Sequence, residues 1–141
     1  MLYFDLKMKF STKTIRKLKE YNIRIVYLFG SRAQKNERIT SDFDIGVVFR
    51  DISQLKNLPD IHPILYNHLT EEFQVTFKND IDIVYLQETS PHFQYEVITK
   101  GKIIFEYDPI FRANYEENVI KEYLDFKPIE KIFSKAILER Q

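Results

Sequence analysis

Residues 25–31 read IVYLFGS and residues 42–49 read DFDIGVVF. Each segment holds a short apolar run, and the first run ends at Gly30. Uninterrupted apolar runs of this length are typical of strands that are buried on both faces of a sheet. The two segments therefore predict two strands, joined by the polar stretch from Arg32 to Ser41.

Periodicity and capping residues predict further elements around this pair. Ser11 begins a helix that runs to about Tyr21. A loop containing Pro59 precedes a helix over about 60–73, with Ile64 on its inner side. The remaining elements are a strand over 81–86, a helix over 90–100, a strand over 103–105 and a long helix from Asp108 onward, which Pro128 should break or kink.

The long helix carries an apolar stripe at helical spacing, made of Phe111, Tyr115, Val119, Ile120, Tyr123 and Leu124. Such a stripe is ordinarily part of a core, but its aromatic content also suits a partner-binding or self-association surface. We expect one α/β (α+β) domain over residues 1–141, with a core at about 1–108 and a C-terminal helical extension at about 109–141.

The composition narrows the class of protein. Twenty-one Lys and Arg residues balance 21 Asp and Glu residues, so we expect no direct nucleic-acid binding driven by net charge. Cysteine is absent, which excludes disulfides and thiolate metal sites. No apolar run approaches the roughly 20 residues that cross a bilayer. We therefore expect a cytoplasmic protein without membrane attachment.

Three acidic residues stand out as candidates for chemistry. Asp42 and Asp44 are two apart at the start of a strand, and strand geometry directs both side chains to the same face. Asp44 and Asp82 each interrupt an apolar segment, where a charge is costly unless a cation or hydrogen bonds satisfy it. If the two strands are neighbours, the three carboxylates form an oxygen-only cluster that suits Mg²⁺ or Mn²⁺.

Gly30, Ser31 and Arg32 supply the complementary half of such a site. Glycine allows the backbone to approach a phosphate closely, and a serine at the start of a helix adds a hydroxyl beside free amide donors. Arg32, Lys35 and Arg38 are nearby cations, and the sequence does not show which of them contacts a triphosphate. Together these residues indicate metal-assisted transfer from a nucleoside triphosphate. Asp82 either completes a second metal position or accepts a proton from the incoming hydroxyl.

Gly30-Ser31, ten residues and then Asp42-Phe43-Asp44 resemble the GSx10DxD signature of the minimal nucleotidyltransferase antitoxins, a branch of the polymerase-beta superfamily. Asp82 falls where that family carries its third acid. Asp80 also precedes an acid by two, but its turn-like context after Lys78-Asn79 favours Asp82 as the ligand. The resemblance covers the chain from about Ile23 onward and implies a mixed sheet packed with helices.

The resemblance also implies a function. Such proteins are usually the antitoxin of a type VII-like pair whose toxin is a HEPN ribonuclease. They transfer AMP from ATP to a tyrosine of that toxin, with Mg²⁺ held by residues at the positions of Asp42, Asp44 and Asp82. A hetero-oligomer with the HEPN toxin is therefore expected.

Two alternatives remain at this point. One is a nucleotidyltransferase that acts on a small hydroxylated molecule such as an aminoglycoside, although larger relatives use an additional helical domain for that purpose. The other is a binding module that neutralises its partner by contact alone, without catalysis.

Overall fold

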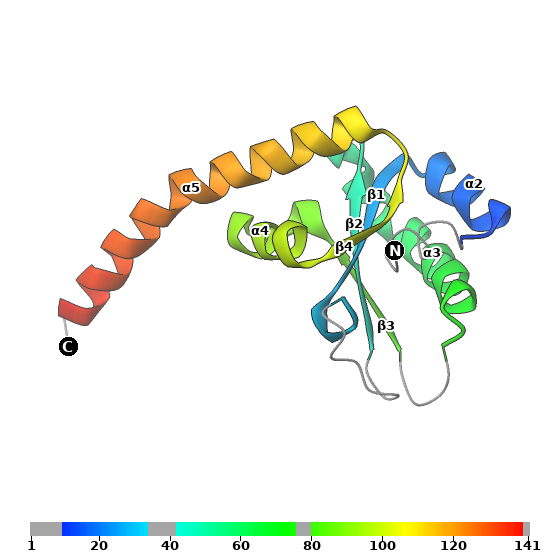
Figure 1. Cartoon of the computed structure of the whole chain (residues 1–141), viewed down its shortest axis with the longest axis horizontal. Coiled ribbons are helices and arrows are strands. Elements are labelled where there is room, and N and C mark those ends of the chain that lie inside the picture. Colours follow the sequence, from blue (N-terminus) through cyan, green and yellow to red (C-terminus); the bar gives the residue numbers. More distant parts are fainter. Residues whose placement is uncertain (1–9, 34–41, 76–79, 140–141) are drawn as a thin grey trace.

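In the computed structural model, residues 10–33, 42–75 and 80–139 are described. Within them, four strands form one sheet in the order β3-β2-β1-β4 (Figure 1). They are β1 (Ile23–Phe29), β2 (Phe43–Phe49), β3 (Ile81–Tyr85) and β4 (Lys102–Glu106). β1 is antiparallel to β2 and to β4, whereas β2 and β3 are parallel. The expected mixed sheet is therefore confirmed.

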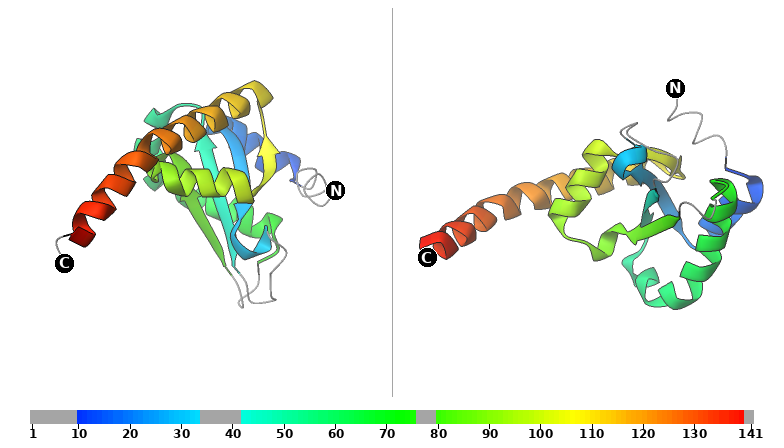
Figure 2. Two further views of the ribbon diagram at one scale, coloured as in Figure 1. Left: turned by 60° about the vertical axis from the view of Figure 1, so that its left-hand side comes forward. Right: turned by 90° about the horizontal axis from the view of Figure 1, so that it is seen from below.

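Helices cover both faces of the sheet (Figures 1 and 2). α2 (Thr12–Glu20) and α3 (Leu58–Glu72) lie on one face, and α4 (Pro91–Lys100) lies on the other beside the first half of α5 (Pro109–Glu139). The predicted caps are present: the Ser11 and Ser90 hydroxyls accept hydrogen bonds from backbone N–H groups three residues on, at 3.2 and 3.1 Å. These caps satisfy amide groups that the first turn of a helix leaves free.

Side chains alternate between two apolar clusters along the central strands. Val26 and Leu28 of β1 pack with α2 and α3, whereas Ile25 and Tyr27 pack with α4 and α5. On β2, Ile45 belongs to the first cluster, so its neighbour Asp44 points to the face that α4 covers. Strand periodicity therefore determines which face of the sheet carries the acids.

Three details differ from the sequence-based expectations. Pro59 lies inside the first turn of α3, where its missing N–H costs no hydrogen bond, and not in a preceding loop. Ile64 is 39% exposed on that helix, so its predicted inward position is wrong. α5 runs through Pro128 as one helix of 31 residues, without a break. Within the described residues, no helix has both the length and the apolarity to cross a membrane.

Candidate active site

Two of the predicted acids are direct neighbours across parallel strands. Asp44 of β2 and Asp82 of β3 are Cα partners in the register of the pair. Partners in adjacent strands direct their side chains to the same face. Asp82 is exposed and Asp44 is half-buried, so the two carboxylates lie at the amino ends of their strands with access to solvent.

Asp42 lies beside them and is fixed by a backbone contact. Its carboxylate oxygen Oδ1 accepts a hydrogen bond from the N–H of Asp80 at 2.9 Å. The carbonyl of Asp80 in turn accepts from the N–H of Phe43 at 2.9 Å, so the segments that enter β2 and β3 are held together. The three acids Asp42, Asp44 and Asp82 are therefore gathered at one corner of the sheet.

The three carboxylates repel one another, and the pKa of Asp44 reflects this repulsion. Burial raises the pKa of the Asp44 carboxyl above its ordinary value, and the charges of Asp82 and Asp42 raise it further. A cation placed between the three acids would reverse this effect. Among the described residues, no three acid or histidine groups form a finished metal cage. Mg²⁺ sites usually take only one or two protein carboxylates and complete their shell with water and substrate phosphate, and for such a site Asp42 and Asp44 are the candidate ligands.

Gly30 is required by this geometry. It follows Phe29, the Cα partner of Asp44 on β1, and its φ of +73° lies in the region that favours glycine. A Cβ at this position would lie 2.1 Å from the Asp44 oxygen Oδ2. The backbone of the bend after β1 therefore touches the central carboxylate of the site.

Ser31 and Arg32 continue from Gly30 into a single 3-10 turn. Both side chains are partly buried, and the Arg32 guanidinium lies 4.0 Å from the centre of the Phe43 ring. Phe43 packs with the apolar cluster under α2 and α3, so this contact places the guanidinium on the face of the sheet opposite to Asp44. The other candidate cations, Lys35 and Arg38, lie outside the described residues.

Asp80 has a different environment from the three acids. Its carboxylate accepts hydrogen bonds from the Tyr66 hydroxyl and, at 2.7 Å, from the N–H of Ile81. These bonds lower the pKa of Asp80. The residue thus braces the start of β3, as its turn-like sequence context indicates. Tyr66 was missed by the sequence analysis, and no local signal marks it, because it comes from α3.

A pocket opens directly beside Gly30. It lies between the end of β1 and α4 and is lined by Phe29, Gly30, Phe93, Glu96, Val97 and Lys100. The Phe29 and Phe93 rings meet edge to face, with centroids 5.7 Å apart, and Lys100 pairs with Glu96 at 2.6 Å. The sequence analysis did not identify this pocket, because it forms only when α4 folds back onto β1.

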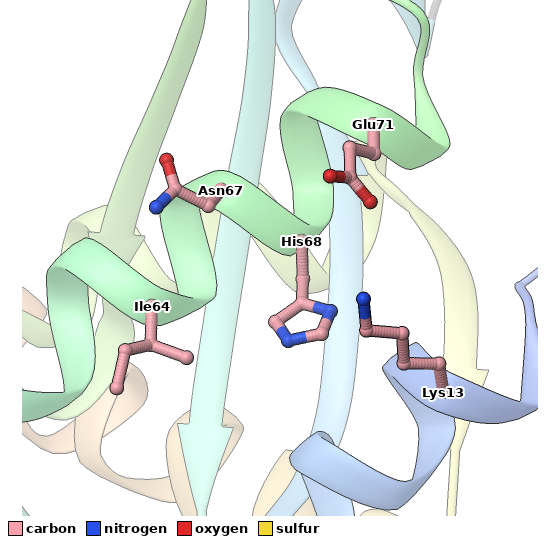
Figure 3. Close-up of a pocket in the computed structure, with 5 residues that line it drawn as sticks. All are labelled: Lys13, Ile64, Asn67, His68 and Glu71. Carbon is pink, nitrogen blue, oxygen red and sulfur yellow. The ribbon is translucent and has the colours of Figure 1, made fainter.

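A second pocket lies between α2 and α3, on the face of the sheet opposite to the acids (Figure 3). In it, the Lys13 ammonium and the His68 ring point toward each other, with Glu71 beside them. It shares no residue with the acid cluster, so it is separate from the candidate active site.

Comparison with known proteins identifies the family. Residues 12–110 match the family model described as "Polymerase beta, Nucleotidyltransferase". The chain belongs to this nucleotidyltransferase family. The matched region includes every element that carries the acids and the Gly30 bend. A protein adenylyltransferase, MntA, of Aphanizomenon flos-aquae (strain 2012/KM1/D3) is 28% identical over 130 residues. The match covers 84% of this nucleotidyltransferase and 86% of that protein.

Solved structures share the fold. A crystal structure of a toxin-antitoxin with AMP-PNP contains a chain with a TM-score of 0.63 and 22% identity, covering 89% of this nucleotidyltransferase and 96% of that chain. A re-refined structure of a tri-AMPylated Shewanella oneidensis HEPN toxin in complex with MNT antitoxin gives a TM-score of 0.57 at 19% identity, with coverages of 94% and 98%. The coverages show that the similarity extends along nearly the whole of each chain.

Proposed function

We propose that this nucleotidyltransferase is a magnesium-dependent protein adenylyltransferase that acts as an antitoxin. It transfers AMP from ATP to a tyrosine of a HEPN ribonuclease toxin and so inactivates it. The observation that carries the proposal is that Asp42, Asp44 and Asp82 lie close together and that Gly30 contacts Asp44. The chain also resembles an adenylyltransferase along most of its length. A reaction that needs ATP and acts on a ribonuclease belongs in the cytoplasm, where both are present.

The transfer is an in-line displacement at the α-phosphorus of ATP. The tyrosine oxygen forms a bond to this phosphorus, the bond to the β-phosphate oxygen breaks, and pyrophosphate leaves. Asp42 and Asp44 would hold Mg²⁺, which supplies charge neutralisation for the phosphates when bound. Asp82, on the neighbouring strand, is placed to share that role or to accept the tyrosine proton.

The residues around the acids have separate tasks. Gly30 leaves space for the Asp44 carboxylate, because a Cβ there would lie 2.1 Å from its oxygen Oδ2, and a glycine also lets a phosphate approach the backbone closely. Ser31 offers a hydroxyl at the same bend. Arg32, at the same bend, would supply a positive charge for the triphosphate on leaving its contact with the Phe43 ring.

The test uses the protein, ATP, Mg²⁺ and the HEPN protein encoded beside it. Mass spectrometry should find AMP on a toxin tyrosine, and the toxin should lose ribonuclease activity. The Asp42→Asn/Asp44→Asn variant should slow the modification by about a hundredfold or more. Asp60→Asn removes an exposed acid on α3 and is the matched control, with unchanged activity. Toxin that is silenced yet carries no added mass would refute the proposal.

One alternative is neutralisation by contact alone. In that case the Asp42→Asn/Asp44→Asn variant would still protect cells from the toxin. Transfer to a small hydroxylated molecule is the other alternative. It is disfavoured because the family match and α5 account for residues 12–139, which leaves no second domain in the described chain to hold such an acceptor.

A further inference from the structure

The pocket beside Gly30 lies in line with the acids across the sheet. Asp82 of β3, Asp44 of β2 and Phe29 of β1 are successive Cα partners, so their side chains point to the same face. Phe29 is also one wall of the pocket. The pocket therefore begins one strand away from Asp44, a separation of roughly 5 Å, on the side away from Asp82.

The pocket combines an apolar wall with a charged rim. The Phe29 and Phe93 rings are half-buried and meet edge to face, and Val97 beside them is 2% exposed. The side chains of Glu96 and Lys100, 39% and 62% exposed, pair with each other at the rim. The volume of the pocket is about 250 Å³. Pockets that hold whole drug-sized ligands measure roughly 300–1,000 Å³, so this one suits a single ring system.

Backbone packing fixes the α4 wall of the pocket against β1. At the end of α4, the Gly101 N–H donates to the Val97 carbonyl at 2.7 Å. A Cβ on Gly101 would lie 3.1 Å from the carbonyl oxygen of Leu28, so the end of the helix packs closely on the strand. The pocket is thus formed before anything binds, as is usual for small-molecule sites.

The charges around the pocket favour an uncharged group. The pocket lies at the C-terminal end of α4, where the helix dipole is negative, and Glu96 adds a carboxylate. Lys100 is already paired with that carboxylate. Phosphates are therefore disfavoured in the pocket and belong at the proposed Mg²⁺ site. An aromatic ring is favoured, because the faces and edges of Phe rings attract other rings.

The position of Asp82 separates the two aromatic groups of the proposed reaction, which are the adenine of ATP and the acceptor tyrosine. Asp82 is placed to accept the tyrosine proton, so the acceptor ring approaches from the β3 side. The pocket lies on the other side of Asp44, at β1. The ribose of ATP, which joins the α-phosphate to the base, would cross the step of one strand from Asp44 to the pocket.

We propose that the pocket beside Gly30 is the base subsite of the enzyme and holds the adenine ring of ATP against the Phe29 and Phe93 rings. The inference rests on the proposed use of ATP and assigns Phe93 as a binding residue for that substrate. Contact of a base with an aromatic side chain contributes roughly tenfold to a hundredfold to affinity.

Binding of two probes separates the base from the phosphates. Isothermal titration calorimetry in Mg²⁺ compares α,β-methylene-ATP, which cannot transfer AMP, with inorganic tripolyphosphate, which has no base. Phe93→Ala should raise the dissociation constant of the ATP analogue about tenfold or more and leave that of tripolyphosphate unchanged. Phe93→Tyr keeps the ring and should bind the analogue as the unmodified protein does. His92→Ala removes an exposed ring from the same helix and is the matched control for both probes.

A second variant tests the pocket without deleting a ring. Val97→Met extends a side chain of the wall into the pocket and should weaken binding of the ATP analogue alone. Equal weakening of both probes by Phe93→Ala and by Val97→Met would overturn the proposal.

Unchanged binding of both probes by Phe93→Ala would overturn it as well, and a raised KM for the toxin would then assign the pocket to the acceptor tyrosine. The proposed function fails on a different result. A protein that binds the analogue through Phe93 but adds no AMP to the toxin would keep the base subsite and lose the adenylyltransferase activity.

Discussion

Gly30 follows β1, Asp44 lies on the antiparallel strand β2, and the two residues are in close contact at the end of β1. The absence of a side chain at position 30 is what allows the Asp44 carboxylate to stand where it does. The positive φ adds a second requirement for glycine at the same residue. The most constrained backbone position in the site is thus also the one that contacts its central acid.

Gly30→Ala should therefore disrupt the site more than it disrupts the fold. We expect roughly 1–2 kcal/mol of destabilisation from the left-handed backbone conformation. Transfer activity should fall by about a hundredfold, since a shift of about 1 Å in a catalytic group has that effect. Urea denaturation measures the first quantity and AMP transfer the second. An active Gly30→Ala protein would show that the bend lies outside the reaction centre.

Asp44→Asn should make the protein more stable while removing activity. The raised pKa of Asp44 means that the folded state disfavours the charged form, so stability falls as pH rises through this pKa and the penalty is present at neutral pH. Removing the charge should raise Tm by roughly 2–4 °C at pH 7. Differential scanning calorimetry measures this change in Tm. The Mg²⁺-induced rise in Tm, expected for the unmodified protein, should be absent in the variant. A lower Tm would contradict the repulsion among the acids.

The residues that form the acid cluster could be predicted only in part. Asp42, Asp44 and Gly30 are identified by spacing along the chain, since strand alternation and the glycine bend are local properties. The pairing of Asp44 with Asp82 depends on β3 lying parallel to β2, which no local pattern specifies. The contact of Tyr66 with Asp80 likewise joins α3 to β3, so the bracing role of Tyr66 was not predictable.

At the level of elements, the starts of helices were predicted correctly where a capping residue lies close in sequence to the amides that it caps. Ser11 and Ser90 begin α2 and α4 as expected, because a serine side chain and the amides it caps are only three residues apart. The start of α3 was misplaced because Pro59 is equally compatible with a loop and with a first helical turn. Ile64 of α3 was misplaced for a related reason. Hydrophobic periodicity shows which residues share a helix face, but it does not show how far the rest of the protein covers that face.

The link between α2 and α3 gives an element-scale prediction. Glu72, the last residue of α3, accepts hydrogen bonds from the Ser11 hydroxyl at 2.6 Å and from the Ser11 N–H at 2.9 Å. Burial raises the pKa of Glu72, but the bonds from Ser11 and Thr14 outweigh it and leave the pKa below its ordinary value. A lowered pKa stabilises the fold above the unfolded value of 4.5, and this stability is lost as pH falls through the folded value.

Glu72→Gln should consequently destabilise the protein by about 1 kcal/mol at pH 7. The difference from the unmodified protein should shrink as the pH is lowered below 4.5, the ordinary value for this group. Urea denaturation at several pH values measures both effects. Glu71→Gln, which changes the exposed neighbour, is the matched control. A difference that grows in acid would rule out the stabilising role of the charged Glu72.

On the scale of the whole molecule, the acid cluster and the anchor of α5 lie at opposite ends of the sheet. The acids are at the Phe29 end of β1, whereas Glu106, which anchors α5, pairs with Ile25 at the other end. Arg112 of α5 contacts Glu106 and, at 3.0 Å, Glu116, whose other oxygen accepts from the buried Tyr27 hydroxyl at 2.6 Å. The first turns of α5 are therefore fixed to the sheet by a partly buried ionic network remote from the site.

Arg112→Met should loosen this anchor without altering the acids. The Glu106 side chain is only 7% exposed, so loss of its guanidinium partner should cost about 2–3 kcal/mol of unfolding free energy. The double variant Arg112→Met/Glu106→Gln should recover part of that loss, because it removes the buried charge as well. The Mg²⁺-induced rise in Tm should be the same in all three proteins, since the metal site is at the far end of β1. If Arg112→Met abolished that rise while the fold persisted, the two ends of the sheet would be coupled, and the anchor would regulate the active site rather than merely position α5.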